Sequence, residues 1–149
     1  MTVIDVLSRH AWVVPLKTKS AQSVSRALET IFVTSQRWPN YLTTDEGKEF
    51  YNSHVKKLLA KYKVHHFSVY SRMKSSLSER FNRTLQEKIN RYMIANDTPK
   101  FIDVVPSLVS GYNNTIHTVT KMRPAEIDMF NAPVLARRLF GRKKRHLAS

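Results

Sequence analysis

Cysteine is absent from the 149 residues, which excludes disulfides, cysteine-ligated zinc and thiol nucleophiles. Glycine and proline are scarce, with 3 and 6 copies, so the composition is not that of a low-complexity or disordered chain. No apolar run approaches the roughly 18 residues of a membrane-spanning helix. The opening residues do not show a basic stretch followed by an apolar run, so no secretory signal is expected. A globular domain with one core is the class that remains.

Acidic residues are also scarce: 11 Asp and Glu accompany 25 Lys and Arg, which gives a formal net charge of +14. A charge this high on a small domain favours a polyanionic partner, most often nucleic acid. No acid follows Asp128, so we expect a body over residues 1–130 and a basic tail over residues 131–149. The tail is either a solvated, frayed end or an arm for nuclear localisation or phosphate binding. Its last basic cluster is Arg142, Lys143, Lys144 and Arg145.

The spacing of apolar residues indicates alternating strands and helices, which is typical of an α/β domain. Strands are expected over residues 2–6 and 11–16, as a hairpin, over 41–44, as a buried strand, and over 64–69. Helices are expected to begin after Ser20, at residues 52–53, at Leu77 and at Thr98-Pro99, with a kink at Pro106. A polar loop is expected over residues 70–76, and a short last helix from Pro124.

Two carboxylates stand where a metal site could form. Asp45 follows a strand and precedes a glycine-containing turn, and Glu79 opens a helix after a basic loop. Converging carboxylates would suit a pair of Mg²⁺ ions, which stabilise the attacking and leaving oxygens of a phosphoryl displacement. Lys74, Arg83 and other nearby bases would then neutralise a DNA backbone. The alternative is structural: Asp45 belongs to a tight turn, and Glu79 decorates a helix start.

Four separated blocks carry a resemblance that extends over roughly residues 2–130. They read IDVLSRHAWVVPLKTKSA, LTTDEGKEFYNSHVKKLLAKYKVHHFSV, SERFNRTLQEKINRYM and GYNNTIHTVTKMRPAEI. In this order they resemble the catalytic core of a retrovirus-like integrase, closest to integrases of Maverick/Polinton-type transposons, with gypsy-like retrotransposon integrases more distant. The resemblance implies a ribonuclease-H-like fold, a mixed sheet flanked by helices. It also implies an Asp, Asp, Glu triad that binds Mg²⁺ or Mn²⁺ and cleaves and joins DNA strands.

The resemblance assigns roles to several residues. Asp45 corresponds to the second acid of the triad and Glu79 to the third. Asn82 and Arg83 match positions that contact the DNA end, while Asn113 and His117 are expected to brace the core. The residues expected to contact DNA are Lys48, Lys74, Asn82, Arg83, Arg142, Lys143, Lys144 and Arg145. Self-association and a nuclear location in a eukaryotic host are implied in the same way.

The first acid of the triad is not matched. Asp5 belongs to the block of the family's second strand, so we expect it to hydrogen-bond the Leu7–Arg9 turn rather than a metal. The central first strand is then expected to be missing, which leaves two strands with unpaired backbone groups at about 1–3 kcal/mol each. With two of three ligands, metal affinity and activity are expected to be lost. The alternatives are a DNA-binding remnant without activity and a non-functional pseudogene product.

Overall fold

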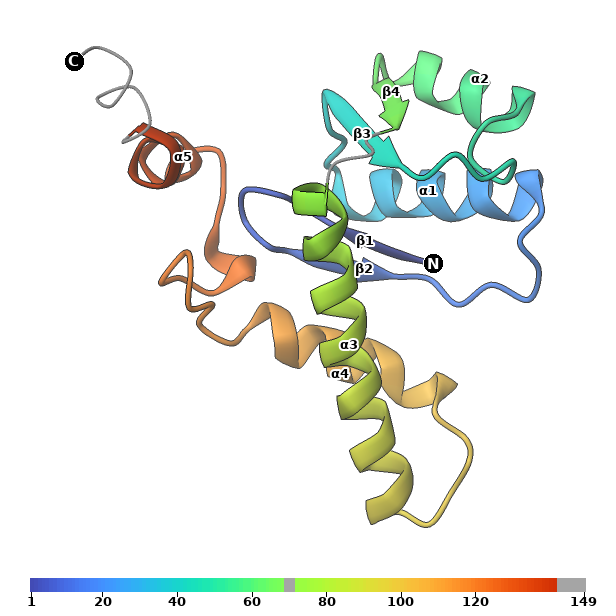
Figure 1. The fold of residues 1–149 in the computed structure, drawn as a ribbon, viewed down its shortest axis with the longest axis vertical. Coiled ribbons are helices and arrows are strands. Elements are labelled where there is room, and N and C mark those ends of the chain that lie inside the picture. Colours follow the sequence, from blue (N-terminus) through green and yellow to red (C-terminus); the bar gives the residue numbers. More distant parts are fainter. Residues whose placement is uncertain (69–71, 142–149) are drawn as a thin grey trace. The chain divides into compact units, whose positions relative to one another are not determined.

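The computed structural model describes residues 1–68 and 72–141, and the side chains of these residues apart from 72–75. The chain divides into two compact units, which are described separately below. Met1 and Val14–Ser76 form the first, called the Asp45 unit after the acid that it contains. Thr2–Val13 and Leu77–Ser149 form the second, called the Glu79 unit. Figure 1 follows the course of the chain through its helices and strands.

Two helices pack together to form the core of the Asp45 unit. Helix α1 (Ala21–Ser35) is capped by Ser20, whose hydroxyl accepts a hydrogen bond from the Ser23 amide at 3.2 Å. Helix α2 (Ser53–Lys61) is capped by Asn52, whose side chain accepts from the Val55 amide at 3.0 Å. Apolar side chains at helical spacing bury the facing surfaces: Val24, Ala27, Leu28, Ile31 and Phe32 on α1, and Val55, Leu58 and Leu59 on α2.

Strands β3 (Tyr41–Thr44) and β4 (His65–Ser68) are parallel neighbours joined through α2. Their register pairs Tyr41 with His65 and Thr44 with Ser68. The sequence predicted β3 at its observed bounds, but the prediction that it is buried was wrong. The strand alternates between exposed and half-buried residues, and Tyr41 is 67% exposed. This alternation reflects a strand with one face toward solvent.

The Glu79 unit combines a hairpin with helices. Strand β1 (Thr2–Ile4) pairs antiparallel with β2 (Ala11–Val13), which confirms the predicted hairpin. Helix α3 (Arg72–Ala95), which belongs to this unit from Leu77 onward, packs Phe81, Leu85 and Ile89 with Ala11 and Val105 in one buried cluster. The remaining elements are η1 (Ile102–Val104), α4 (Val105–Asn113), η2 (Pro124–Glu126) and α5 (Ala132–Phe140). Figure 1 draws α3 as the longest of these helices.

Several predicted boundaries were wrong. Helix α3 begins at Arg72, inside the stretch predicted as a loop, while residues 69–71 lie outside the described residues. Thr98 does not begin α4: its hydroxyl accepts from the Lys100 amide at 3.1 Å, and the α-helix begins at Val105. Pro106 therefore lies in the first turn of α4, where proline is tolerated, and introduces no kink. Within the expected tail, residues 132–140 form α5, and the division at residue 130 stays a prediction.

The two edges of the hairpin differ. At the edge of β2, the buried side chain of Asn113 takes the place of a neighbouring strand by bonding both backbone groups of Ala11. Its Oδ1 accepts from the Ala11 amide and its Nδ2 donates to the Ala11 carbonyl, both at 2.9 Å. The predicted bracing role of Asn113 is thereby confirmed. On β1, the Asp5 amide donates to the His10 carbonyl at 2.8 Å, so by antiparallel alternation Thr2 and Ile4 direct their backbone groups away from β2. Among the described residues, no other strand pairs with β1.

Candidate functional site

Asp45 lies directly after β3, with its side chain exposed in a tight turn. Its Oδ1 accepts a hydrogen bond from the Gly47 amide at 2.8 Å, so the turn that the sequence analysis gave as an alternative is present. A carboxylate offers about four acceptor positions, so this bond leaves oxygen lone pairs for other ligands. Glu49 folds back over the turn: a Cβ built on Gly47 would lie 2.4 Å from Glu49 Oε2. Glu49 was not among the residues predicted for the site.

The carbonyl of Asp45 is held by neighbouring hydroxyl groups. Thr44 Oγ1 donates to it at 2.8 Å, and Ser68 Oγ donates to it at 3.4 Å from the end of β4. Thr44 Oγ1 also lies 2.7 Å from His66 Nε2, and the Tyr51 hydroxyl contacts Ser68 Oγ. We call Thr44, Tyr51, His66 and Ser68 the Asp45 support. This cluster could not be predicted from the sequence, because only the parallel register of β3 and β4 brings its members together.

Tyr51 and His66 of the Asp45 support also stack on each other. Their ring centroids are 4.3 Å apart, and the ring planes differ by 14°. Burial lowers the pKa of His66 below its ordinary value, which favours the neutral imidazole. A neutral imidazole carries one donor and one acceptor nitrogen, so it can take part in a directed hydrogen-bond chain.

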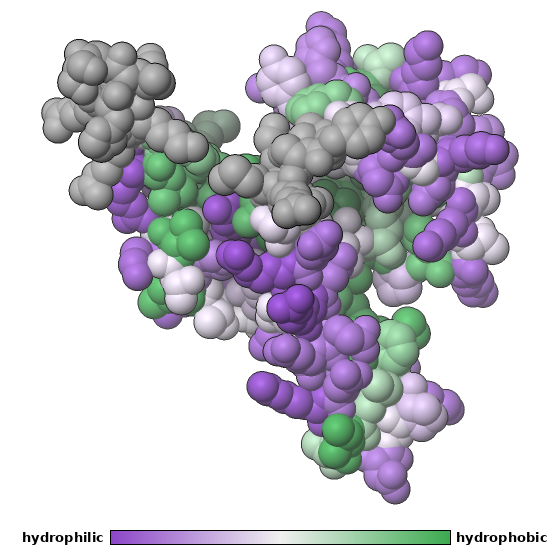
Figure 2. Space-filling view, in the orientation of Figure 1, coloured by the Kyte–Doolittle hydropathy of each residue, from purple (hydrophilic) through white to green (hydrophobic). Residues whose placement is uncertain are grey.

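Glu79 lies on the exposed face of α3. Asn82 and Arg83, at three and four residues along the helix, share this face and are also exposed. Asn82 Oδ1 accepts a hydrogen bond from the Thr2 hydroxyl at 2.7 Å, which ties α3 to β1 within the Glu79 unit. Phe81, Leu85 and Ile89 lie on the opposite, buried side of the helix. Figure 2 shows that the surface over α3 is largely hydrophilic.

Asp5 has the structural role that the sequence predicted. Its Oδ2 accepts from the Ser8 amide at 3.1 Å and from the Ser8 hydroxyl at 2.5 Å, and its carbonyl accepts from the Arg9 amide at 2.9 Å. Ser8 belongs to the turn and is buried. The carboxylate therefore serves the β1–β2 connection.

Basic groups gather at one place in the Glu79 unit that the sequence analysis did not identify. His117 has a lowered pKa, because of burial first and then of the cationic Arg9 and Arg80. Burial lowers the pKa of Arg9 and raises that of Tyr112, and these two groups also interact. The Nδ1 atom of His117 accepts from the Val119 amide at 3.1 Å, so His117 braces the loop after α4, and its predicted bracing of the core stays a prediction.

The other predicted DNA contacts are placed only in part. Lys48 is exposed in the turn after Asp45. The side chain of Lys74 and the whole of Arg142, Lys143, Lys144 and Arg145 lie outside the described residues. These residues therefore stay predictions from the sequence.

A metal would find oxygen ligands in both units, although Asp45 and Glu79 are not members of one compact unit. Exposed carboxylates such as these, and Glu49 beside Asp45, are the donors that Mg²⁺ and Mn²⁺ prefer. Within residues 1–68 and 72–141, no three His, Asp or Glu side chains gather into a metal-binding group. The donor chemistry fits a divalent ion, and each acid alone offers an incomplete site.

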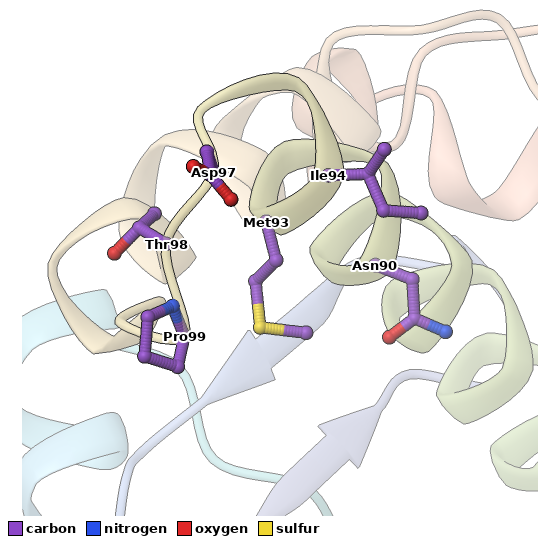
Figure 3. Close-up of a pocket in the computed structure, with 6 residues that line it drawn as sticks. All are labelled: Asn90, Met93, Ile94, Asp97, Thr98 and Pro99. Carbon is purple, nitrogen blue, oxygen red and sulfur yellow. The ribbon is translucent and has the colours of Figure 1, made fainter.

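A pocket of about 480 Å³ in the Glu79 unit does not coincide with either acid. It lies at the end of α3 and in the loop that follows, lined by Asn90, Met93, Ile94, Asp97, Thr98 and Pro99 (Figure 3). Asn90 lies 11 residues after Glu79, which corresponds to about 16 Å along a helix. The pocket is thus separate from the candidate site. In the described part of the chain, no helix has the length and apolar content needed to cross a lipid bilayer.

The sequence is similar to those of proteins from mobile elements. A transposon-derived protein of Caenorhabditis elegans is 38% identical over 136 residues, which cover 90% of this chain and 48% of that protein. The transposon Tf2-3 polyprotein of Schizosaccharomyces pombe is 28% identical over 137 residues, 90% of this chain and 10% of the polyprotein. The chain thus spans about half the length of the first relative and a small part of the second. No family model matches the sequence.

The fold is similar to those of solved integrases. The HTLV-2 integrase catalytic core domain, in complex with magnesium, superposes with a TM-score of 0.73 at 16% identity over 85% of this chain and 81% of that chain. A chain of the simian T-cell lymphotropic virus intasome, in complex with the PP2A regulatory subunit B56 gamma, gives a TM-score of 0.75 at 17% identity over 83% of this chain and 45% of that chain. The predicted fold class is confirmed: this chain has the ribonuclease-H-like α/β fold of retroviral integrase catalytic cores.

Proposed function

We propose that the chain is the catalytic-core segment of a transposon-derived integrase, a protein that binds DNA and joins its strands with a divalent metal. One observation carries the proposal: TDEGKEF and SERFNRTL, the blocks with Asp45 and Glu79, fall at the end of β3 and on α3 of an integrase-core fold. The HTLV-2 core of that fold was solved in complex with magnesium. We propose Mg²⁺ or Mn²⁺ as the cofactor here.

In this proposal, Asp45 and Glu79 supply carboxylate oxygens to the metal. Bound divalent ions would stabilise the attacking and leaving oxygens of a phosphodiester displacement. Arg83, Lys48 and the amide nitrogen of Asn82 would approach the DNA phosphates from exposed positions. The remaining proposed contacts are Lys74, Arg142, Lys143, Lys144 and Arg145. The net charge of +14 supports DNA as the partner.

We propose that the 149 residues alone do not perform strand transfer. The carboxylate of Asp5 is already bound by Ser8 in the hairpin turn, so Asp5 is poorly suited to be a third ligand. This observation favours the second candidate, a DNA-binding remnant that keeps the basic surface without the reaction. The two candidates share DNA binding and differ in whether the acids are used.

A strand-transfer assay with Mn²⁺ and a labelled DNA duplex, run together with DNA binding at several salt concentrations, tests this proposal. We expect salt-dependent binding in the wild type and in Asp45→Ala and Glu79→Ala, and no product in any of them. Product from the wild type that disappears in both variants would show an active enzyme and overturn the inactivity proposal. Absence of DNA binding would contradict both candidates.

We also propose that the first strand of the fold is missing from the 149 residues and is supplied by a segment outside them. The outer edge of β1 supports this, because Thr2 and Ile4 direct backbone groups away from β2, whereas Asn113 closes the edge of β2. Strand β3 likewise pairs on one side only among the described strands. Two-stranded sheets are marginal by themselves.

Hydrogen exchange tests the missing-strand proposal. We expect the Ile4 amide to exchange fast in the 149-residue chain and to become protected when the coding sequence upstream is included. The Val3 amide, which faces β2 by the same alternation, is the internal control. Slow exchange of Ile4 in the 149-residue chain would contradict the proposal.

Three further features of the proposed function come from resemblance. We propose descent from a Maverick/Polinton-type element, a nuclear location in a eukaryotic host and self-association. The HTLV-2 core was solved in trimeric and dimeric forms, which supports the last of these. Sedimentation of the purified chain over a range of concentrations would test self-association.

A further inference from the structure

The carbonyl oxygen of Asp45 receives hydrogen bonds from both sides of the β3–β4 pair. Thr44 Oγ1 donates at 2.8 Å, and Ser68 Oγ donates at 3.4 Å. A carbonyl oxygen has two lone pairs, so these two hydroxyl groups occupy its acceptor capacity. The peptide plane that follows Asp45 is therefore fixed by side chains from two strands.

Counting the hydroxyl protons gives the direction of the hydrogen bonds farther out. Thr44 has one hydroxyl proton. When it gives this proton to the Asp45 carbonyl, it accepts at the 2.7 Å contact from His66 Nε2, which then carries the proton of the neutral ring. In the same way, Ser68 accepts from the Tyr51 hydroxyl when it donates to Asp45. With these directions, two series of hydrogen bonds, one from His66 and one from Tyr51, end on the Asp45 carbonyl oxygen.

The two series are joined at their outer ends. The rings of Tyr51 and His66 stack with centroids 4.3 Å apart. Tyr51 comes from the segment before α2 and His66 from β4, so the stack links two elements that flank Asp45. The arrangement is a closed cluster around the backbone of an exposed carboxylate.

We propose that Tyr51 and His66 are positioning residues for Asp45, acting through Ser68 and Thr44 on its carbonyl. The purpose of this positioning rests on the proposed function: the support presents the Asp45 carboxylate to a divalent metal. Among the described residues, the carboxylate itself accepts one hydrogen bond, from the Gly47 amide, so its direction depends on the backbone that carries it. If that backbone is fixed before the metal binds, less conformational entropy is lost on binding.

The tautomer of His66 and the environment of the Asp45 carbonyl are readouts that do not depend on metal. Nitrogen-15 NMR of the full chain is expected to show the proton of His66 on Nε2. His66→Phe keeps a ring against Tyr51 but removes the donor, so the carbon-13 shift of the Asp45 carbonyl should move. His66→Gln supplies a side-chain amide donor and should restore it. His65→Phe is the matched control, since His65 stacks instead on Tyr41.

Mn²⁺ binding tests whether the Asp45 support prepares Asp45 for a divalent metal. Paramagnetic broadening of the Gly47 amide detects weak binding, which suits a site with an incomplete ligand set. We expect His66→Phe to weaken Mn²⁺ binding by about 5-fold, the size of one net hydrogen bond, and Tyr51→Phe to weaken it by a similar factor. His66→Gln should recover most of the affinity, and His65→Phe should leave it unchanged.

Each outcome supports or contradicts one of the two proposals. A proton on Nδ1 of His66, or an unchanged Asp45 carbonyl shift in both His66→Phe and Tyr51→Phe, overturns the positioning role. Unchanged Mn²⁺ affinity in both variants does the same. If the wild type binds no Mn²⁺ while the tautomer and carbonyl shifts are as expected, the support exists and the proposed metal function fails. Tyr51→Phe removes only an oxygen from a partly exposed ring, so it provides a test if His66→Phe does not fold.

Discussion

The two acids of the candidate site are held in different ways. Asp45 follows a strand and depends on hydrogen bonds, from Gly47 to its side chain and from Thr44 and Ser68 to its carbonyl. Glu79 lies on α3, whose opposite face buries Phe81 and Leu85 in an apolar cluster. A loop after a strand requires polar bracing, whereas a helix presents a side chain wherever its buried face anchors it. Loss of the apolar packing under α3 should therefore disturb the surroundings of Glu79, and loss of polar groups should disturb those of Asp45.

The largest effect is expected from Phe81→Ala. Phe81 is buried and packs edge-on against Tyr112, with centroids 4.9 Å apart. Its removal leaves a cavity under α3, so the free energy of unfolding should fall by about 3–5 kcal/mol. Denaturant unfolding measures this change. Phe130→Ala, at a residue that is 84% exposed, is the control and should change stability by no more than about 0.5 kcal/mol. Equal effects of the two substitutions would contradict the anchoring role of α3.

Asn113→Ala should have the next largest effect. It is an exception to the contrast between the two acids, because here a polar side chain stabilises the Glu79 unit. The substitution leaves the amide and the carbonyl of Ala11 without their partner. We expect a loss of about 2–4 kcal/mol in the free energy of unfolding. Asn114→Ala removes an exposed amide that donates to the Ser110 carbonyl and should cost far less. A small effect at Asn113 would show that β2 does not need this closure.

Asn52→Ala tests the polar bracing of the Asp45 unit. Asn52 caps α2, and its Nδ2 donates at 2.9 Å to the carbonyls of Lys48 and Glu49, in the turn that follows Asp45. We expect a loss of about 1–2 kcal/mol and faster amide exchange over residues 47–52. Ser53→Ala, at the neighbouring exposed residue, is the control. Unchanged exchange in the turn would mean that the cap supports only the helix.

The smallest predicted effect is a pH dependence from His117. Burial and the charges of Arg9 and Arg80 hold its pKa in the folded state below the value of about 6.5 expected in the unfolded chain. Below that pH the unfolded state binds more protons, so stability should fall as the pH drops from 7 toward 5. His117→Gln should reduce this slope in unfolding measurements over that range. An identical slope in the variant would contradict the contribution of His117.

Local signals predicted many elements correctly. Ser20 and Asn52 cap their helices as expected, and β3 has the predicted bounds, because caps and short β-branched runs act over a few residues. The start of α3 was wrong because its first residues are polar and contain no apolar periodicity. The exposure of Tyr41 was missed for a different reason: which face of a strand is covered depends on tertiary packing.

The sequence predicted only those residues of the candidate site that lie within short motifs. Asp45, Glu79 and the role of Asp5 came from short blocks in which neighbouring residues act together. Thr44, Tyr51, His66 and Ser68 are separated by up to 24 positions, and they meet only when β3 and β4 take up a parallel register. A single sequence contains no local pattern that predicts contacts between residues so far apart in the chain.

The proposed function depends on Asp45 and Glu79 as metal ligands, and an NMR titration with Mn²⁺ tests this most directly. We predict that Mn²⁺ broadens amide signals around Asp45 and around Glu79. Asp45→Asn should abolish the broadening around residue 45, and Glu79→Gln should abolish the broadening around residue 79. Broadening that survives the replacement of the nearby acid, or that occurs only elsewhere in the chain, would contradict their role as ligands.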